Sequence, residues 1–368
     1  MLQHWLQPIE IDKIKGFSTL DKTHFGRKIA LHTEGVLPDL STVQIAILGI
    51  GDADTNAVRS CLYGLSCPFS LISIADLGDL RKHETSFIVP LLAELLAGGI
   101  VPIIIGYSED FSLAQFQAFR NARKAVNMAL IDEKIRYSST IKAENYFLHQ
   151  ILDDVHLFNC AVIGYQSHFT DPSVISLFDD KNFELIRLGR MRTAVDEAEP
   201  IIRDADLLSF NIAALKMSEA PAQLDGSPNG LMSEDACQIA RYAGASDKLM
   251  SFGIYGFREK FDENQQTAQI VAQMMWYFME GFGNRKQDFP MPTAMKQMTQ
   301  YVIDIKSFDY RLTFWRSNRS GLWWMEIPTK SKRKHERHRL VPCSYNDYLQ
   351  ACNDDLPERL INAARRFK

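Results

Sequence analysis

Eight short and almost entirely apolar runs alternate with helical patterns along the first 255 residues, and they constrain the fold more than any other feature. Runs of strand length with no polar face are typical of parallel strands that helices cover on both sides. Repeated strand–helix alternation predicts a three-layer α/β domain with a mainly parallel sheet, with a closed eight-stranded barrel as the rival. The predicted strands are residues 43–50, 70–77, 100–106, 126–132, 159–165, 183–189, 206–212 and 249–255, and the clearest helices are 85–99, 233–244 and 265–282.

The pattern changes after Arg285, where prolines interrupt the stretch KQDFPMPTAM and predict a boundary. We therefore expect an α/β domain over residues 1–290 and a small C-terminal α+β extension over residues 291–368. Within the extension, YVIDI, YRLTFWRS and SGLWWMEIP predict three short strands, and DLPERLINAARRF predicts a closing helix.

Composition narrows the class of protein. The net charge of −4 gives the chain no overall attraction to nucleic acid, so we expect no nucleic-acid partner. Apolar runs such as GGIVPIIIG have the length of a strand, and none is long enough to cross a bilayer. The six cysteines form no CxxC pair, and Cys160 and Cys237 lie in apolar runs typical of buried free thiols. Because free thiols fit a reducing compartment, we expect a cytoplasmic protein.

Polar side chains follow two of the predicted strands at their carboxyl ends, where open parallel sheets bind ligands. Glu109 and Asp110 follow the third apolar run, and Asp132, Lys134 and Arg136 follow the fourth. On spacing alone these residues form a convergent cluster. Two interpretations stay open, a functional site and a set of satisfied ion pairs at the edge of the sheet.

The extension carries two features of a partner surface. Trp323 and Trp324 are adjacent, so on a strand they point to opposite sides, and we expect one in the core and the other at an interface or against the main domain. The basic run KSKRKHERHR, residues 330–339, includes Arg333 and Arg337 and is a candidate site for an acidic partner, although a solvated hairpin loop is the favoured interpretation. Trp and Arg are over-represented at interface hot spots, so residues 291–368 are predicted to contact a protein partner or a second copy of the chain.

Four stretches resemble, in the same order, strand ends of the ureohydrolase superfamily, which includes arginase, agmatinase and formimidoylglutamase. SFNIAALKMSEAP is similar to a family strand end that reads Ser-Phe-Asp-x-Asp, followed in the formimidoylglutamase branch by Ser-Asp-Ala-Pro. IIIGYSED resembles the Gly-Gly-x-His loop, and ALIDEKIRY resembles Asp-Ala-His-x-Asp. GLMSEDACQIARYAG with the following LMSFGIYGF resembles the next helix and strand. The resemblance covers residues 40 to 285 and implies the arginase-like α/β fold.

Members of this superfamily hold two manganese ions with four aspartates and two histidines, and the ions bridge a hydroxide that attacks a guanidinium or formimino carbon. Such hard divalent ions require anionic oxygen ligands. The resemblance, taken position by position, places Glu109 at the first histidine, Asp132 at the first aspartate, Lys134 at the second histidine, Arg136 at the next aspartate, Asn211 and Ala213 at the last aspartate pair, and Gly256 at the substrate-facing glutamate of arginase-like members.

The charges at these positions set the expected function. Lys134 and Arg136 balance Glu109 and Asp132, and their cationic groups have no lone pair to give a metal. We therefore expect no bound cofactor and a non-catalytic protein that acts as a binding, scaffold or regulatory component. We also expect the two cations to fill the manganese volume and pair with the two carboxylates, with Asp110 as a further partner. The alternatives are a manganese-dependent hydrolase of linear amidines with an unusual metal site, and an enzyme with metal-free chemistry in the same cleft.

Overall fold

The computed structural model describes residues 4–50, 55–122, 125–137, 146–327 and 339–367. All eight predicted strands are present, and with two short N-terminal strands they form one ten-stranded sheet. Its strands are β1 (Leu6–Gln7), β2 (Ala30–Leu31), β3 (Ile45–Ile50), β4 (Ile74–Leu80), β5 (Val101–Gly106), β6 (Val126–Ile131), β7 (Leu157–Tyr165), β8 (Glu184–Arg187), β9 (Leu207–Asn211) and β10 (Ser251–Tyr255).

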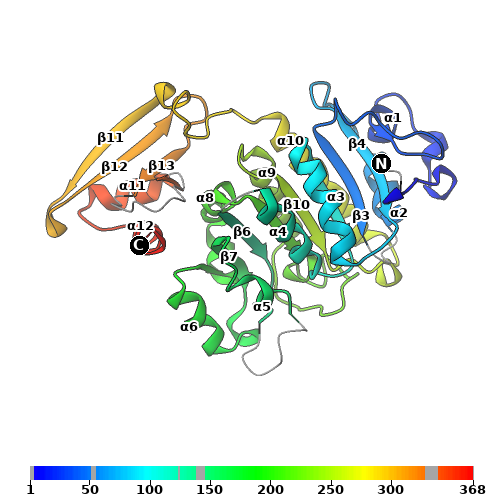
Figure 1. Ribbon diagram of the computed structural model, residues 1–368. Coiled ribbons are helices and arrows are strands. Elements are labelled where there is room, and N and C mark those ends of the chain that lie inside the picture. The colour runs from blue at the N-terminus through cyan, green and yellow to red at the C-terminus, as the bar shows by residue number, and fades with distance from the viewer. Residues whose placement is uncertain (1–3, 51–54, 123–124, 138–145, 328–338, 368) are drawn as a thin grey trace.

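The sheet is open and almost wholly parallel. Its order is β1-β4-β3-β5-β10-β9-β6-β7-β8, with β2 also paired to β4. Among the described strands of this sheet, β1 against β4 is the one antiparallel pair. The sheet ends at β8 and does not close, so the arrangement is the predicted α/β sandwich and not the rival barrel (Figure 1).

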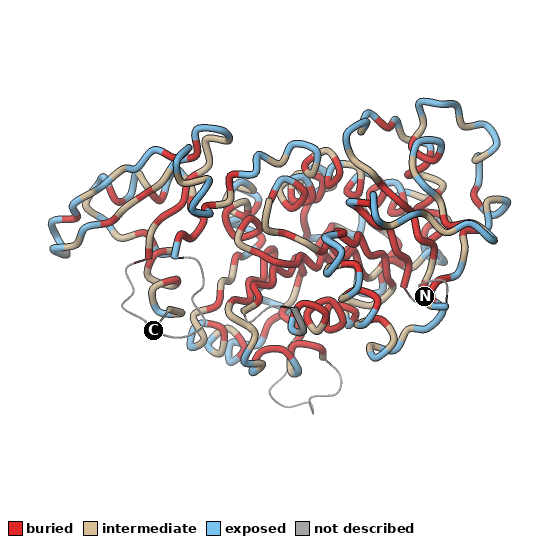
Figure 2. Tube along the Cα trace, turned by 45° about the horizontal axis from the view of Figure 1, so that its top comes forward, coloured by how far each residue is buried: buried red, intermediate tan, exposed pale blue. Residues whose placement is uncertain are grey.

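Helices cover both faces of this sheet, and the core lies in two layers between them. Within β3, Ile45 and Ile47 face one layer while Ala46 and Leu48 face the other, as period-two geometry requires. Helices α2 (Thr55–Tyr63), α9 (Ser233–Ala245) and α10 (Gln266–Gly283) pack in the first layer, and α3 (Thr85–Ala97) and α4 (Phe111–Ala122) pack in the second. Figure 2 shows the buried strands running through the middle of the molecule. The helices of this part are α1 (Phe25–Lys28), α2 (Thr55–Tyr63), α3 (Thr85–Ala97), α4 (Phe111–Ala122), α5 (Leu148–Ile151), α6 (Pro172–Asp180), α7 (Leu188–Thr193), α8 (Ala198–Asp204), α9 (Ser233–Ala245) and α10 (Gln266–Gly283).

Most strands match the predicted runs to within one to three residues, and β4 differs most, at both of its ends. The run 70–77 was expected to be a strand from its first residue, but β4 begins at Ile74 and Leu71 is 93% exposed. The strand continues beyond the run to Leu80 and includes Asp79, which pairs with Arg59 of α2 at 3.0 Å, as does Asp76 within the run. Buried acids are tolerated in a strand when a cation compensates them.

The chain beyond residue 297 forms a second, four-stranded antiparallel sheet with two helices on it (Figure 1). The three predicted strands and the closing helix are present, and a fourth strand and a further helix were not predicted. The division into domains at residue 290 stays a prediction. The elements are β11 (Met298–Ile305), β12 (Tyr310–Ser317), β13 (Trp323–Glu326), β14 (Leu340–Cys343), α11 (Tyr345–Cys352) and α12 (Glu358–Arg366).

The two adjacent tryptophans point to opposite sides of β13, as expected. Trp323 lies in the core between the second sheet and α11, where its ring stacks on Tyr348 at 4.7 Å between centroids. Trp324 faces the main sheet's α8, with the guanidinium carbon of Arg203 4.4 Å from a ring centroid. Both rings are buried, at 9% and 2% exposure, because this chain itself covers them, and their contact with a partner stays a prediction. The other two predicted partner residues, Arg333 and Arg337, lie outside the described residues.

The structure can be compared with two further expectations, which concern membrane-spanning helices and free cysteines. In the described part of the chain, no helix is long and apolar enough to span a membrane. All six cysteines are free, and Cys160 and Cys237 are buried as predicted.

Candidate functional site

Four neighbouring strands bring the predicted site residues to one edge of the main sheet. β5, β10, β9 and β6 lie side by side in that order and run parallel, so their carboxyl ends meet. Glu109 follows β5, Gly256 follows β10, Asn211 ends β9 and Asp132 follows β6. Because residues that follow adjacent parallel strands share one crevice, the strand order explains why side chains distant in sequence come together here.

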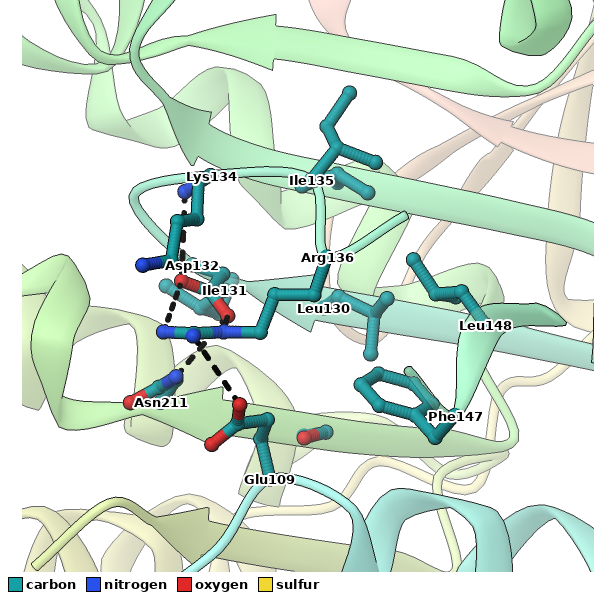
Figure 3. A pocket seen from close by; sticks show the side chains of 12 residues that line it. Glu109, Leu130, Ile131, Asp132, Lys134, Ile135, Arg136, Phe147, Leu148 and Asn211 are labelled. Atoms are coloured by element: carbon teal, nitrogen blue, oxygen red, sulfur yellow. Dashed lines mark hydrogen bonds and ion pairs between the residues drawn. The ribbon is translucent and has the colours of Figure 1, made fainter. Parts of the chain in front are cut away.

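Arg136 is the centre of this cluster (Figure 3). Its Nε donates to Asp132 Oδ2 at 2.8 Å, and its Nη1 lies 3.1 Å from Glu109 Oε1. A second, longer contact joins Nη2 to Asp132 Oδ1 at 3.4 Å. Arg136 is 9% exposed and Asp132 6%, so the ion pairs lie largely out of solvent. The prediction that a cation from this stretch pairs with both carboxylates is confirmed for Arg136.

The burial of Arg136 comes partly from an apolar wall beside its side chain. Leu130, Phe147 and Leu148 line the same small space as the cluster, as Figure 3 shows. The volume left between all these side chains is about 10 Å³, close to what one water molecule needs.

Burial and charge act in opposite directions on the ionisation of this cluster. Burial alone would lower the pKa of Arg136, but the charges of Asp132 and then Glu109 outweigh it and raise that pKa above its ordinary value. Burial also raises the pKa of Glu109, and the charge of Arg136 opposes that rise. The guanidinium therefore stays charged and keeps Glu109 closer to its ionised form.

Asn211 and Ala213 form a local turn at the end of β9. Asn211 Nδ2 donates to Asp132 Oδ2 at 3.1 Å, while its Oδ1 accepts the backbone N–H of Ala213 at 3.0 Å. Ala213 is buried and offers no side-chain donor or acceptor. Gly256, on the neighbouring loop, has φ of +85°, and a Cβ there would lie 2.6 Å from Asn211 Oδ1. A glycine is required at 256 by its left-handed backbone and by this close approach.

The prediction for Lys134 is wrong in its partner. Its Nζ pairs with Asp225 Oδ2 at 2.9 Å and not with Glu109 or Asp132. The strand β6 ends at Ile131, so the chain bends before residue 134 and the period-two relation to Asp132 is lost. Lys134 consequently sits at the outer side of the cluster, with 28% of its side chain exposed.

Asp110 does not join the cluster, contrary to expectation. It is exposed and accepts a hydrogen bond from Ser108 Oγ at 3.0 Å in the turn before α4. The place predicted for it is taken by Asp225, whose carboxylate lies 3.7 Å from Arg136 Nη1. The hydrogen bond from Lys134 lowers the pKa of Asp225.

Glu133 is a second residue that the sequence reasoning missed. It is 2% exposed, and its Oε2 has no hydrogen-bond partner among the described residues. Burial, and next the charge of Asp132, raise the pKa of Glu133 to about 7. Its position between two site residues was visible in the stretch DEKIR, whereas nothing local in the sequence marks Asp225.

Metal coordination requires several donors around one point. Within the described ranges, no group of three or more His, Cys, Asp or Glu side chains gathers so that it could hold a metal ion. The carboxylates of Glu109 and Asp132 have the guanidinium of Arg136 between them.

Comparisons with known proteins agree with this fold. No protein-family model matches the chain. A formimidoylglutamase of Staphylococcus aureus (strain MSSA476) is 19% identical over 241 residues, which are 61% of this chain and 78% of that protein. A Trypanosoma cruzi formiminoglutamase solved with Mn²⁺ superposes with a TM-score of 0.61 at 18% identity, over 68% of this chain and 96% of that one.

Two further solved structures extend the likeness across the group. The formimidoylglutamase of Bacillus subtilis gives a TM-score of 0.59 at 15% identity, over 68% of this chain and 93% of that one. The agmatine ureohydrolase of Thermoplasma volcanium gives a TM-score of 0.51 at 15% identity, over 67% of this chain and 92% of that one. The open parallel sheet between two helical layers is thus the arginase-like α/β fold, here with an additional antiparallel sheet at the C-terminus. The chain is a distant member of the arginase, or ureohydrolase, superfamily.

Proposed function

We propose that this chain is a non-catalytic member of the superfamily that acts as a binding, scaffold or regulatory component. The observation that carries the proposal is the buried guanidinium of Arg136, which lies 2.8 Å from Asp132 and 3.1 Å from Glu109. It takes the volume between the two carboxylates, and a cation supplied by the protein replaces one supplied by a metal. The fold persists because its strands and core do not depend on a metal.

The side chains present do not fit a pair of manganese ions. Lys134 and Arg136 have no lone pair to donate, and Ala213 has no donor atom at all. Asn211 has an oxygen, but that oxygen is already engaged by the backbone N–H of Ala213. Hard divalent ions require several anionic oxygen ligands, and the carboxylates left at these positions are neutralised by Arg136.

Gly256, which the resemblance places at the substrate-facing glutamate, supports the same proposal. A side chain at position 256 would collide with Asn211, so a glutamate there is incompatible with this local backbone. The remaining space of about 10 Å³ is far below the several hundred Å³ of an ordinary ligand pocket. A non-catalytic role therefore accounts for both the ligand positions and the substrate position.

A manganese-dependent hydrolase of linear amidines is the second candidate, favoured by the number of carboxylates near the cleft. Asp225 and Glu133 add two acids that the resemblance did not include. If Arg136 moved out, these acids and Asp132 could contribute to an unusual metal site. The proposal of a non-catalytic chain requires that Arg136 stays between the carboxylates when Mn²⁺ is present.

The deciding experiment measures hydrolysis by chain purified without chelators. N-formimino-L-glutamate, L-arginine and agmatine are each offered with and without added Mn²⁺, and release of formamide or urea is measured. The Bacillus subtilis formimidoylglutamase, assayed in parallel, shows that the conditions support the reaction. We expect no product above background, and turnover that depends on Mn²⁺ would establish the second candidate instead.

Two further proposals concern location and organisation. We propose a cytoplasmic location, because six free thiols fit a reducing compartment. We also propose that residues 1–290 and 291–368 are separate domains, since they carry separate sheets and separate hydrophobic clusters.

A further inference from the structure

The two edges of the C-terminal sheet differ in how they are covered. β14 forms one edge, contains Pro342 and packs against α8. β11 forms the opposite edge, and among the described residues no strand pairs with its outer side. Figure 1 shows β11 at the periphery of the molecule, with none of the described elements beyond it.

β11 lacks the devices that normally keep an edge strand from pairing. Its sequence, MTQYVIDI, contains no proline and no lysine, and its register with β12 runs through eight residue pairs without a bulge. Its one charged residue, Asp304, is paired with Arg311 of β12 at 2.7 Å. An edge strand of this length presents a row of backbone N–H and C=O groups to which a further strand can add.

Apolar side chains are exposed on both faces beside this edge. On the outer face Val302 is 50% exposed. On the inner face α11 packs over β11, with the rings of Tyr301 and Tyr348 5.6 Å apart, and it leaves Tyr345 and Leu349 53% and 39% exposed. An unpaired edge with apolar surface beside it is typical of an interaction site.

We propose that the outer edge of β11 pairs with β11 of a second copy of this chain, antiparallel about a two-fold axis centred on Val302. The two four-stranded sheets then form one continuous eight-stranded sheet. This inference goes beyond the proposed function and does not depend on whether the chain is catalytic. It replaces the buried tryptophans as the partner surface of the C-terminal extension.

The side chains select this register. A two-fold axis perpendicular to the sheet keeps every side chain on its own face, so residues that lie opposite each other must belong to the same face. The axis therefore lies between the two copies of a single residue, and not midway between two successive residues. Centring on Val302 places Gln300 opposite the partner's Asp304, where the amide donates to the carboxylate, and Tyr301 opposite the partner's Ile303. An axis centred on Tyr301 gives a pairing of the same length, but it places Asp304 opposite the partner's Met298, which is apolar. Centring on Asp304 opposes two like charges, which is destabilising.

The first test compares the oligomeric state of full-length variants by sedimentation velocity over the micromolar range. Val302→Lys brings two ammonium groups together across the axis, and its exposed position leaves folding intact. Val36→Lys is the matched control, because Val36 is also exposed, at 60%, and lies in the N-terminal part of the chain. We expect dimers of the unaltered chain and of the control, and dimerisation weakened by about tenfold or more in Val302→Lys. A monomeric unaltered chain, or a fully dimeric Val302→Lys variant, overturns the proposal.

The second test locates the axis. In a Cys352→Ser background, which removes the exposed native thiol, Val302→Cys puts two thiols directly opposite each other across the strand pair. Mild oxidation should give a covalent dimer, whereas Val36→Cys in the same background should stay monomeric on a non-reducing gel. A dimer that does not cross-link through position 302 shows that another surface or another register holds the copies together and contradicts the proposal.

Discussion

The Nε atom of Arg136 lies 2.8 Å from Oδ2 of Asp132, and both side chains are largely buried. The two residues are separated by one turn of chain after β6, so the cation and its carboxylate come from the same short segment. Glu109, from the loop after β5, completes the pairing. The site thus carries its own permanent positive charge, and this relationship is the basis of the predictions below.

Removing the guanidinium should destabilise the fold. Arg136→Ala leaves the buried Asp132 and the partly buried Glu109 without their cation, so we expect a loss of about 3 kcal/mol in the free energy of unfolding. Arg241→Ala is the matched control, because Arg241 forms a solvent-exposed pair with Glu280 at 2.9 Å. The control should cost no more than about 1 kcal/mol. If urea unfolding gave the same loss of stability for both substitutions, the ion pairs of Arg136 would contribute no more to stability than an exposed ion pair does.

The buried carboxyl of Glu133 should make stability depend on pH. Its pKa is raised to about 7 in the folded chain, above the ordinary value of 4.5, so the folded state holds this proton more tightly than the unfolded state does. Stability is therefore lost as pH rises from 4.5 towards 7. Glu133→Gln removes this loss, so the variant should match the unaltered chain near pH 4.5 and exceed it by up to about 3 kcal/mol above pH 7.

Unfolding measured across this pH range tests the prediction for Glu133. Glu358→Gln, at an exposed residue, is the control and should leave the curve unchanged. A Glu133→Gln variant whose stability advantage is the same at pH 4.5 and pH 8 would mean that the carboxyl does not stay protonated in the folded chain.

Metal binding should return only when several positions change together. The combined variant carries Glu109→His, Lys134→His, Arg136→Asp, Asn211→Asp and Ala213→Asp, and it restores the donor types that the resemblance implies. We expect Mn²⁺ binding by calorimetry for this variant and none for Arg136→Asp alone, because one added carboxylate does not complete a divalent site. Binding by the single variant at a similar affinity would show that Arg136 alone blocks the metal.

Arg203 should hold the C-terminal sheet against α8. Its Nη2 donates to the backbone oxygens of Trp323 and Cys343 at 3.1 and 3.2 Å, and its guanidinium lies over Trp324. Arg203→Ala removes these hydrogen bonds and the ion pair of Arg203 with Glu199 at 2.6 Å, so we expect a loss of about 2 kcal/mol and faster hydrogen exchange in β13 and β14. Exchange that stays unchanged there, with Arg241→Ala as the control, would contradict this role.

The main sheet could be read from the sequence because its signal is local. Each strand is a run of apolar residues, and helices with their own period lie between them, so eight strands were placed without knowledge of any partner. The boundary of β4 was misplaced because it depends on Arg59, a residue of α2 that pairs with Asp76 and Asp79. Apolar patterning alone does not reveal that Asp79, which follows the predicted run, belongs inside a strand.

The site was predicted only in part, because some of its contacts join residues that are close in sequence and others join distant residues. Arg136 and Asp132 lie four residues apart, so their pairing followed from proximity once the strand end was placed. Asp225 is 91 residues from Lys134, in a loop with no marking pattern, and only the folded chain brings the two together. Asp110 was expected at the site because it follows the third apolar run, but the turn before α4 leaves it in solvent.

The most direct test of the central claim is a crystal structure of the unaltered chain grown with excess MnCl₂ and measured at the manganese absorption edge. We predict no anomalous peak between the strand ends, with a nitrogen of Arg136 in salt-bridge contact with both Asp132 and Glu109. A manganese peak beside Asp132, with the Arg136 side chain displaced towards solvent, would contradict the account.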